Sequence, residues 1–363
     1  VNIGEIPLGG NYPIRLQSMT NTPTLDIKKT TDQAIRIFKA GGDFVRITTA
    51  SIKEAEALAE IKKLLRKKGY SFPLIADVHF NPEIAEKAAT IVEKIRINPG
   101  NYYNLKASLN NPDAETDSLR KKILPLIKIC KEYGTAIRIG ANHGSLSQRI
   151  LQQYGNTAKG MVVSAMEFLK IFSELDFHNI VVAMKASDPR MTVYATQLLV
   201  QTMQEEGMNY PLHLGVTEAG EGEDGRIKSA VGIGTLLKNG IGDTVRVSLT
   251  EEPENEIPVA RQIVDYCSVR NPKKKHDYIL QGHNWFHYEK RESDCIASVG
   301  GHNPVRVFNK NFSDSSTEFI ISKKEKKVLE SSRKKSYNII PVKTIIEKND
   351  YYEKPAFLEI SIN

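Results

Sequence analysis

Five basic side chains stand at or near the ends of short apolar segments: Arg46, Arg96, Arg138, Lys185 and Arg246. A single arginine in a buried strand is usually explained by a neighbouring carboxylate. Five are too many for that explanation, because the same segment ends offer only Asp77, Asp188 and Glu218. Two unit charges about 8 Å apart repel by roughly 2 kcal/mol at an effective dielectric near 20. The sequence therefore predicts an anionic ligand, and guanidinium groups suit phosphate oxygens.

Other polar residues at the segment ends extend this predicted site. The candidates for ligand contact, besides the five cations, are Gln17, Ser18, Asp77, His79, Asn142, His213, Thr217 and Ser248. Glu218 is the candidate catalytic residue, as a general acid or base, and a counter-ion role for Arg246 or Lys185 fits it equally well. Nearby cations lower the pKa of such a carboxyl and burial raises it, so its protonation state stays open. The two histidines also fit structural roles, and with no third ligand beside Asp77 and His79 we expect no metal site.

The elements that must position these residues repeat one pattern, an apolar run followed by a turn and an amphipathic helix. The eight runs cover residues 16–20, 44–48, 74–77, 94–98, 136–140, 180–185, 212–216 and 244–248. Ser51 with Glu54 forms a capping box, and Asp26, Asn81 and Asp188 are further helix caps. Eight such units in about 268 residues predict an α/β fold, a (β/α)8 TIM barrel. A doubly wound sheet is less suitable because no G-x-G-x-x-G follows the first strand.

The segment after the seventh run, "TEAGEGEDGRIKSAVGIG", is rich in glycine. We expect its helix to cover residues 227–238, with Arg226, Lys228 and Ser229 at the opening. Free backbone N–H groups at a helix start attract phosphate, and barrel phosphate sites often lie near the seventh and eighth strands. The loop therefore predicts a second source of phosphate contacts.

Composition indicates a globular protein and a cytoplasmic location. The sequence holds 40% hydrophobic and 26% charged residues, shows no apolar run long enough for a membrane span or signal peptide, and has three scattered cysteines. The net charge of +7 does not predict nucleic-acid binding, because residues 269–363 carry 18 Lys and Arg against 12 Asp and Glu, leaving 32 against 31 before them. Interleaved acidic residues favour a solvated surface over a phosphate-tracking groove.

Seven motifs in chain order resemble the 4-hydroxy-3-methylbut-2-enyl diphosphate synthase family of the methylerythritol phosphate isoprenoid pathway: "LQSMTNT", "ADVHF", "IRINPGN", "IRIGANHGSL", "MKASD", "PLHLGVTEAG" and "KSAVGIGTLLKNGIGDTVRVSL". The resemblance implies an oxidoreductase that reductively opens and dehydroxylates 2-C-methyl-D-erythritol 2,4-cyclodiphosphate. It assigns substrate binding to Arg46, Arg96, Arg138, Asn142, Lys185, Arg246 and Ser248, and places Glu218 beside the reacting carbons.

The same resemblance implies a [4Fe-4S] cluster in a separate C-terminal domain, held by three cysteines and a glutamate, with flavodoxin or ferredoxin as electron donor. Cys130, Cys267 and Cys295 have no C-P-x-C context, so the cluster ligands are not in this chain. We expect residues 1–268 to be the substrate barrel and 269–363 the start of an insert domain. A fragment of this kind should bind the cyclic diphosphate with negligible turnover. A homodimer is compatible with the resemblance, and no membrane partner is expected.

Two other functions stay open on the sequence. One is a different phosphate-binding barrel enzyme that resembles the pterin-binding synthases. The other is a basic nucleic-acid-binding module formed by residues 269–363, where Trp285, Phe286 and Tyr288 could stack on bases. A metal site at His283, His287 and Cys295 competes there with a surface histidine pair, which is the commoner arrangement.

Overall fold

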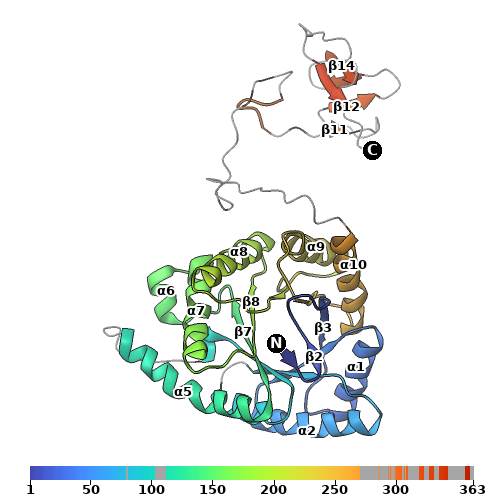
Figure 1. Cartoon of the computed structure of the whole chain (residues 1–363). Coiled ribbons are helices and arrows are strands. Elements are labelled where there is room, and N and C mark those ends of the chain that lie inside the picture. Colours follow the sequence, from blue (N-terminus) through green and yellow to red (C-terminus); the bar gives the residue numbers. More distant parts are fainter. Residues whose placement is uncertain are drawn as a thin grey trace. The chain divides into compact units, whose positions relative to one another are not determined.

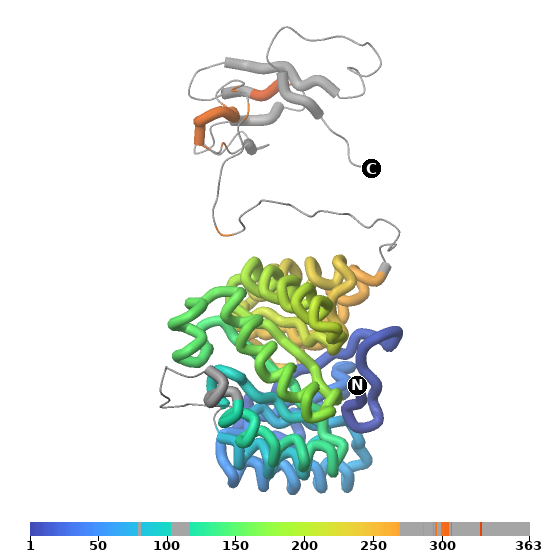
Figure 2. Tube along the Cα trace, turned by 60° about the vertical axis from the view of Figure 1, so that its left-hand side comes forward, coloured from blue at the N-terminus to red at the C-terminus, as the bar shows by residue number. Residues whose placement is uncertain are grey.

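The computed structural model describes residues 1–78, 81–102 and 112–269, and beyond them 286, 293, 295, 299–304, 306, 308–309, 319–322, 327–330, 335–341 and 356–359. The chain divides into two compact units, Val1–Asp277 and Tyr278–Asn363. Figure 1 and Figure 2 show the first unit as a ring of helices around a central sheet. Each unit is described by itself.

The first unit is an eight-stranded parallel barrel. Its strands are β3 (Arg15–Met19), β4 (Phe44–Thr49), β5 (Leu74–Val78), β6 (Lys94–Ile97), β7 (Ala136–Asn142), β8 (Ile180–Lys185), β9 (His213–Leu214) and β10 (Thr244–Val245). They follow one another from β3 to β8, β10 pairs with both β3 and β9, and a bridge between Val182 and Leu212 joins β8 to the start of β9. All eight runs expected from the sequence are strands, so the predicted TIM barrel is confirmed.

Helices cover the outside of the barrel. They are α1 (Ile27–Lys39), α2 (Ile52–Lys67), α3 (Pro82–Ala89), α4 (Pro99–Tyr102), α5 (Pro112–Tyr133), α6 (Gln148–Tyr154), α7 (Ala158–Glu174), α8 (Pro189–Glu205), α9 (Gly222–Lys238), η1 (Pro253–Asn255) and α10 (Glu256–Val269). The expected caps form: Asp26 accepts from the Lys29 N–H at 3.1 Å, and Glu54 accepts from the Ala50 N–H at 2.7 Å in the capping box with Ser51. Asn81 and Asp188 cap α3 and α8, each followed by a proline.

Two hydrophobic clusters hold the barrel together. The larger lies between strands and helices and includes Val45, Ile95 and Leu214. The smaller fills the interior at the amino ends of the strands, where Phe44, Ile75, Ala136 and Val181 pack with Ile3 and Leu8. Ile3 belongs to an antiparallel hairpin of β1 (Asn2–Ile3) and β2 (Ile6–Pro7). The hairpin therefore closes the amino end of the barrel. The functional site is thus expected at the carboxyl end.

Side chains from alternate strands form layers inside the barrel. The register gives a lower layer of Phe44, Lys94, Val181 and Thr244, a middle layer of Gln17, Ile75, Arg138 and His213, and an upper layer of Arg46, Arg96, Ala183 and Arg246. Charged and polar groups thus begin in the lower layer, where Lys94 lies beside Phe44, in positions that apolar side chains usually fill.

The second unit contains a five-stranded sheet in the order β11 (Phe308–Asn309), β12 (Phe319–Ser322), β13 (Lys327–Glu330), β14 (Lys335–Pro341) and β15 (Ala356–Glu359). Its central strands pair antiparallel and both outer pairs are parallel.

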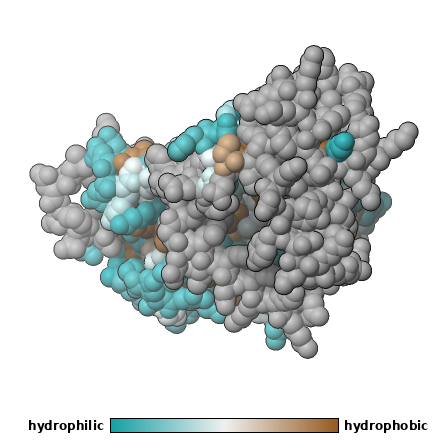
Figure 3. Space-filling view, turned by 90° about the horizontal axis from the view of Figure 1, so that it is seen from above, coloured by the Kyte–Doolittle hydropathy of each residue, from teal (hydrophilic) through white to brown (hydrophobic). Residues whose placement is uncertain are grey.

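The coloured residues visible in Figure 3 are mostly hydrophilic. Among the described residues, no helix combines the length and apolarity that a bilayer span requires.

Candidate functional site: a cationic barrel mouth

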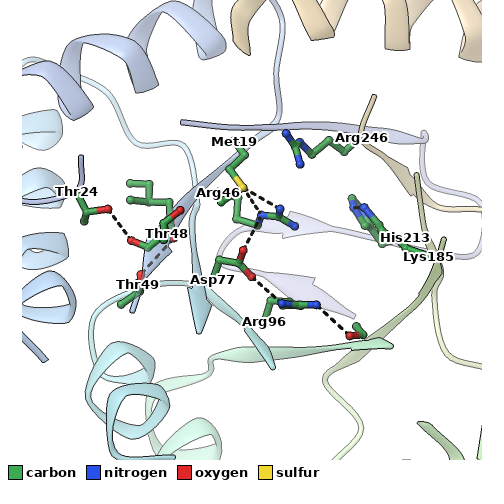
Figure 4. A network of polar contacts seen from close by, with 12 residues as sticks. Met19, Thr24, Arg46, Thr48, Thr49, Asp77, Arg96, Lys185, His213 and Arg246 are labelled. Atoms are coloured by element: carbon green, nitrogen blue, oxygen red, sulfur yellow. Dashed lines mark hydrogen bonds and ion pairs between the residues drawn. The ribbon is translucent and has the colours of Figure 1, made fainter. Parts of the chain in front are cut away.

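The five basic side chains predicted to meet do meet at the carboxyl end of the barrel. Arg46, Arg96, Arg138 and Lys185 are each at most 9% exposed, and the Arg246 side chain is 15% exposed. Figure 4 shows Arg46, Arg96, Lys185 and Arg246 coming from four different strands toward one region. Burial lowers the pKa of Arg46 to about 10, against the attraction of Asp77. Even a guanidinium therefore holds its proton less firmly here than in water.

Asp77 neutralises part of this charge. Its carboxylate lies 3.6 Å from the Arg46 Nε and 3.4 Å from the Arg96 Nη1, and it is 2% exposed. Register brings it there, because Asp77 and Arg96 are partner positions of β5 and β6. The Asp77 carboxylate therefore holds two arginines in place, whereas the sequence suggested a ligand contact.

A second buried carboxylate, Glu256, was missed by the sequence analysis. Its oxygens accept from the Arg246 Nε at 3.2 Å and Nη2 at 3.1 Å, and from the Ser18 hydroxyl at 2.6 Å and the Leu249 N–H at 3.2 Å. Glu256 opens α10, which together with η1 packs against β3 and brings the carboxylate beside Arg246. Ser18 therefore points toward Glu256, away from the barrel interior where a ligand contact was predicted. The only advance signal was an acidic residue at the start of the last helix.

Asp188, the third carboxylate expected at this end, faces elsewhere. It caps α8 and forms an ion pair with Arg190 at 2.9 Å, with both side chains exposed. The Arg190 hydrogen bond lowers the pKa of Asp188. Its position before a proline made it both a cap and a site candidate, and only the capping role is seen.

Arg138 is the cation with the least compensation. It is 1% exposed, and its Nε and Nη1 have no hydrogen-bond partner in the described part of the chain. Burial and the neighbouring Arg46 and Arg96 lower its pKa well below the ordinary value. A buried donor without a partner costs about 1–3 kcal/mol, and more when it is charged. Arg138 is thus the strongest single indication that the site binds an anion.

Two glycines make room for the charged side chains. A Cβ at Gly140 would lie 2.8 Å from the Arg96 Nε, and a Cβ at Gly215 would lie 2.8 Å from the Lys185 Nζ. The Gly140 carbonyl also accepts from the Arg96 Nη2 at 3.1 Å. Both glycines follow an inward-facing basic residue or histidine in "RIG" and "HLG", which is a signal that the sequence analysis did not use.

His213 is buried inside the barrel and contacts Lys185. It is 1% exposed in the middle layer, and its Nε2 is 3.2 Å from the Lys185 Nζ. Gln17 shares that layer and is fully buried, with neither amide atom hydrogen-bonded within the described residues. Both residues therefore lie in the same layer of the barrel as Arg138.

The remaining candidates border the site. Asn142, Thr217 and Ser248 are partly buried at the carboxyl ends of β7, β9 and β10. Glu218 is exposed in the turn after β9 and has φ 51°, a conformation that L-residues seldom adopt. His79 lies outside the described residues, as do His283 and His287.

The expected phosphate site at the start of the helix after β9 is not formed as predicted. α9 begins at Gly222, before the residue expected, and its first turn carries Glu223 and Asp224. Acidic residues favour that position through the helix dipole. Arg226 lies one turn in and pairs with Glu251 at 2.5 Å. The helix start is thus acidic, and Arg226 already has a carboxylate partner.

Cations outnumber carboxylates at the barrel mouth among the described residues. Among them, five cations meet at the barrel mouth with two buried carboxylates, and Asp77 and Glu256 form ion pairs with three of the five. Lys94 adds a sixth buried cation below, with its Nζ 4.8 Å from the centre of the Phe44 ring. Burial and Arg138 lower the pKa of Lys94 well below its ordinary value. The barrel mouth is therefore suited to bind a ligand with at least two negative charges.

The described residues do not provide a metal or cluster site. No group of three or more His, Cys, Asp or Glu side chains converges among them. Cys130 is buried, Cys267 is partly buried and Cys295 is exposed, and none forms a disulfide. The Cys267 Sγ is 3.8 Å from the Gly234 carbonyl, and Cys295 accepts from Asn303. These cysteines do not fit the donor set of a four-iron cluster.

The fold and this mouth define a TIM-barrel protein whose site is a group of buried cations at the carboxyl ends of the strands. The chain belongs to the GcpE TIM-barrel domain family, whose model matches residues 1–261. This match does not favour the pterin-binding alternative.

Relatives named 4-hydroxy-3-methylbut-2-en-1-yl diphosphate synthase are similar to this chain. The flavodoxin type from Bacteroides fragilis is 52% identical over 317 residues, covering 84% of this chain and 50% of the relative. The ferredoxin type of Oryza sativa subsp. japonica chloroplasts is 52% identical over 272 residues, covering 73% of this chain and 37% of the relative. The flavodoxin type from Protochlamydia amoebophila is 45% identical over 315 residues, covering 85% and 48%. The chain thus spans about half the length of the bacterial relatives.

Proposed function

We propose that the barrel is the substrate-binding part of an oxidoreductase that converts 2-C-methyl-D-erythritol 2,4-cyclodiphosphate to 4-hydroxy-3-methylbut-2-enyl diphosphate. The observation that carries the proposal is the excess of cations over carboxylates at the barrel mouth, with Arg138 partly unpaired and 1% exposed. A cyclic diphosphate carries two negative charges in a compact group. Relatives named for the diphosphate product supply the substrate class.

Arg46, Arg96, Arg138, Lys185 and Arg246 are proposed to hold the diphosphate. Their common feature is that each comes from a different strand, so the ligand is surrounded. Asn142, Thr217 and Ser248, at the strand ends, would hydrogen-bond the outer oxygens. Asp77 and Glu256 keep three of the guanidinium groups aligned before the ligand arrives, which reduces the cost of ordering them on binding.

Glu218 is the proposed catalytic acid or base. It is exposed beside the mouth, and its φ of 51° holds an L-residue in a strained conformation. Strain of this kind costs about 1–3 kcal/mol and often marks functional positions. From this turn the carboxyl group can reach the carbon end of a ligand whose phosphates lie among the arginines. A proton delivered there would assist departure of the hydroxyl oxygen as water.

The reaction is a two-electron reduction, and electrons must come from outside the described residues. The proposed source is a [4Fe-4S] cluster of the whole enzyme, reduced by flavodoxin or ferredoxin, the words that appear in the relatives' names. The three cysteines of this chain do not fit such a cluster. The part assigned to this chain is therefore binding, orientation and protonation of the substrate. A cytoplasmic location and a homodimer belong to the same proposal.

We also propose that residues 1–268 form the substrate domain and that residues 269–363 begin an insert domain. The family match to residues 1–261 and the separate five-stranded sheet support this division. The boundary between the two compact units falls nine residues later along the chain, between Asp277 and Tyr278.

Calorimetric titration of the 363-residue chain with the cyclodiphosphate tests the proposed ligand. We expect saturable binding that Arg96→Ala weakens, with Arg120→Ala as the matched control because Arg120 pairs with Glu174 on the surface. Pterin diphosphate should bind far more weakly. No binding of the cyclodiphosphate, or stronger binding of the pterin diphosphate, would overturn the proposal.

A further inference from the structure

Lys185 and His213 form a buried pair of nitrogen bases inside the barrel. Lys185 ends β8, and its side chain passes Gly215 to bring the Nζ within 3.2 Å of the His213 Nε2. If the amine donates this hydrogen bond, the Nε2 accepts, so the single imidazole proton is on Nδ1. The Nδ1 is buried with no hydrogen-bond partner in the described residues. A second proton on the imidazole would point at the amine.

The charges that act most on this pair are all positive. Arg138 of β7, Arg46 of β4, Arg96 of β6 and Arg246, which directly follows β10, face Lys185, and Lys94 of β6 also faces His213. Burial first, and these cations second, lower the pKa of both Lys185 and His213 well below their ordinary values. The two carboxylates cannot relieve this, because Asp77 and Glu256 are bonded to arginines.

We propose that His213 is a positioning residue for Lys185 and that the pair takes up a proton when the diphosphate docks. The inference rests on the proposed function, because it needs an anion among the rim arginines. Two negative charges beside Lys185 offset the surrounding positive charge and favour the ammonium form of Lys185. The proton comes from the buffer and stays on the pair, shared through the hydrogen bond of 3.2 Å.

Proton uptake fixes the sign of the pH dependence. Binding and protonation favour each other, so raising the pH must weaken diphosphate binding between the pKa of the empty pair and that of the occupied pair. The cyclodiphosphate suits the measurement, because each of its phosphorus atoms carries one strongly acidic hydroxyl. The ligand is therefore fully ionised across the neutral range and adds no proton of its own.

Calorimetry of the cyclodiphosphate in buffers with different ionisation enthalpies measures this proton directly. For the 363-residue chain we expect a slope of binding enthalpy against buffer ionisation enthalpy that corresponds to uptake of up to about one proton. His213→Gln keeps a polar side chain but cannot share the proton with the Lys185 amine, so it should reduce the slope and weaken binding about tenfold. His178→Gln is the control, since His178 is an exposed histidine at the opposite end of β8.

The outcomes separate this inference from the function beneath it. Absence of cyclodiphosphate binding would overturn the proposed function. Binding with zero slope in the unmodified chain would overturn only the proton uptake, and this result needs no variant to fold. A slope that His213→Gln leaves intact would remove His213 from the inference, and a slope that His178→Gln abolishes would place the proton on the surface.

Discussion

The two ends of the barrel interior differ in polarity: apolar side chains fill the amino end and charged side chains fill the carboxyl end. At the amino end, Ile3, Leu8, Phe44 and Val181 pack into a closed apolar floor. At the carboxyl end, arginines and a lysine are buried with two carboxylates for five cations. A floor of this kind stabilises the fold, whereas buried like charges oppose it. The contrast shows that the apolar floor offsets a cost in stability that the buried charges of the mouth impose.

Breaking the floor should give the largest effect. Phe44→Ala removes a fully buried ring from the interior cluster and should lower the free energy of unfolding by about 3–5 kcal/mol. Diphosphate affinity of the remaining folded protein should change little, because Phe44 lies below the cations. Denaturant unfolding followed by circular dichroism gives the first quantity and calorimetry the second. Tyr12→Ala, at an exposed site, is the control.

Removing a mouth cation should show the reverse pattern. Arg138→Met should weaken cyclodiphosphate binding by about 2–4 kcal/mol and leave the empty barrel as stable or more so. The same two measurements decide the matter. If the empty protein instead loses several kcal/mol of stability, Arg138 is a structural residue and the argument for an anion fails.

Lys94 lies between the apolar floor and the charged mouth of the barrel. Its substitution should show how much a buried charge at this level costs in stability. Its pKa in the folded chain is lowered by burial, so the unfolded chain binds more protons and stability should rise with pH toward the ordinary lysine range. Lys94→Met should raise stability at neutral pH by about 1–4 kcal/mol and flatten this rise. Thermal unfolding of both proteins across pH would show it. Equal slopes would contradict the assignment.

Substitution of Ser18 should give the smallest effect. It tests whether the Ser18 hydroxyl serves the hydrogen bond to Glu256 or contacts the ligand. Ser18→Ala removes one hydrogen bond to Glu256 and should cost about 1 kcal/mol of stability. Diphosphate affinity should stay within about twofold. A large loss of affinity with unchanged stability would restore Ser18 as a ligand contact.

The sequence predicted the strands well because buried parallel strands read as apolar runs between turn signals. It also predicted that Arg46, Arg96, Arg138, Lys185 and Arg246 meet, since all stand at carboxyl ends of strands. It could not find Glu256, because this carboxylate reaches the site from a helix that only the three-dimensional path of η1 brings over β10.

Other errors have equally local causes. Asp188 fits a helix cap and a site residue alike, and the sequence does not say which way its carboxylate turns. The start of α9 was misplaced because glycines near Gly222 looked like loop, whereas the acidic first turn belongs to the helix. For His213 the sequence indicates the strand but not the layer, so its contact with Lys185 could not be predicted.

The pairing of β3 with β10 has a consequence for synthesis of the chain. Leu16 is a partner of Val245, so the first barrel strand cannot find its last neighbour until more than two hundred further residues have been made. At about 5–20 residues per second this takes roughly ten to fifty seconds. During that interval the edge of β3 is unpaired, and the arginines of β4, β6 and β7 are still open to water. The repulsion between the Arg46 and Arg246 guanidinium groups is therefore met only when the ring closes, as one of the last events in folding.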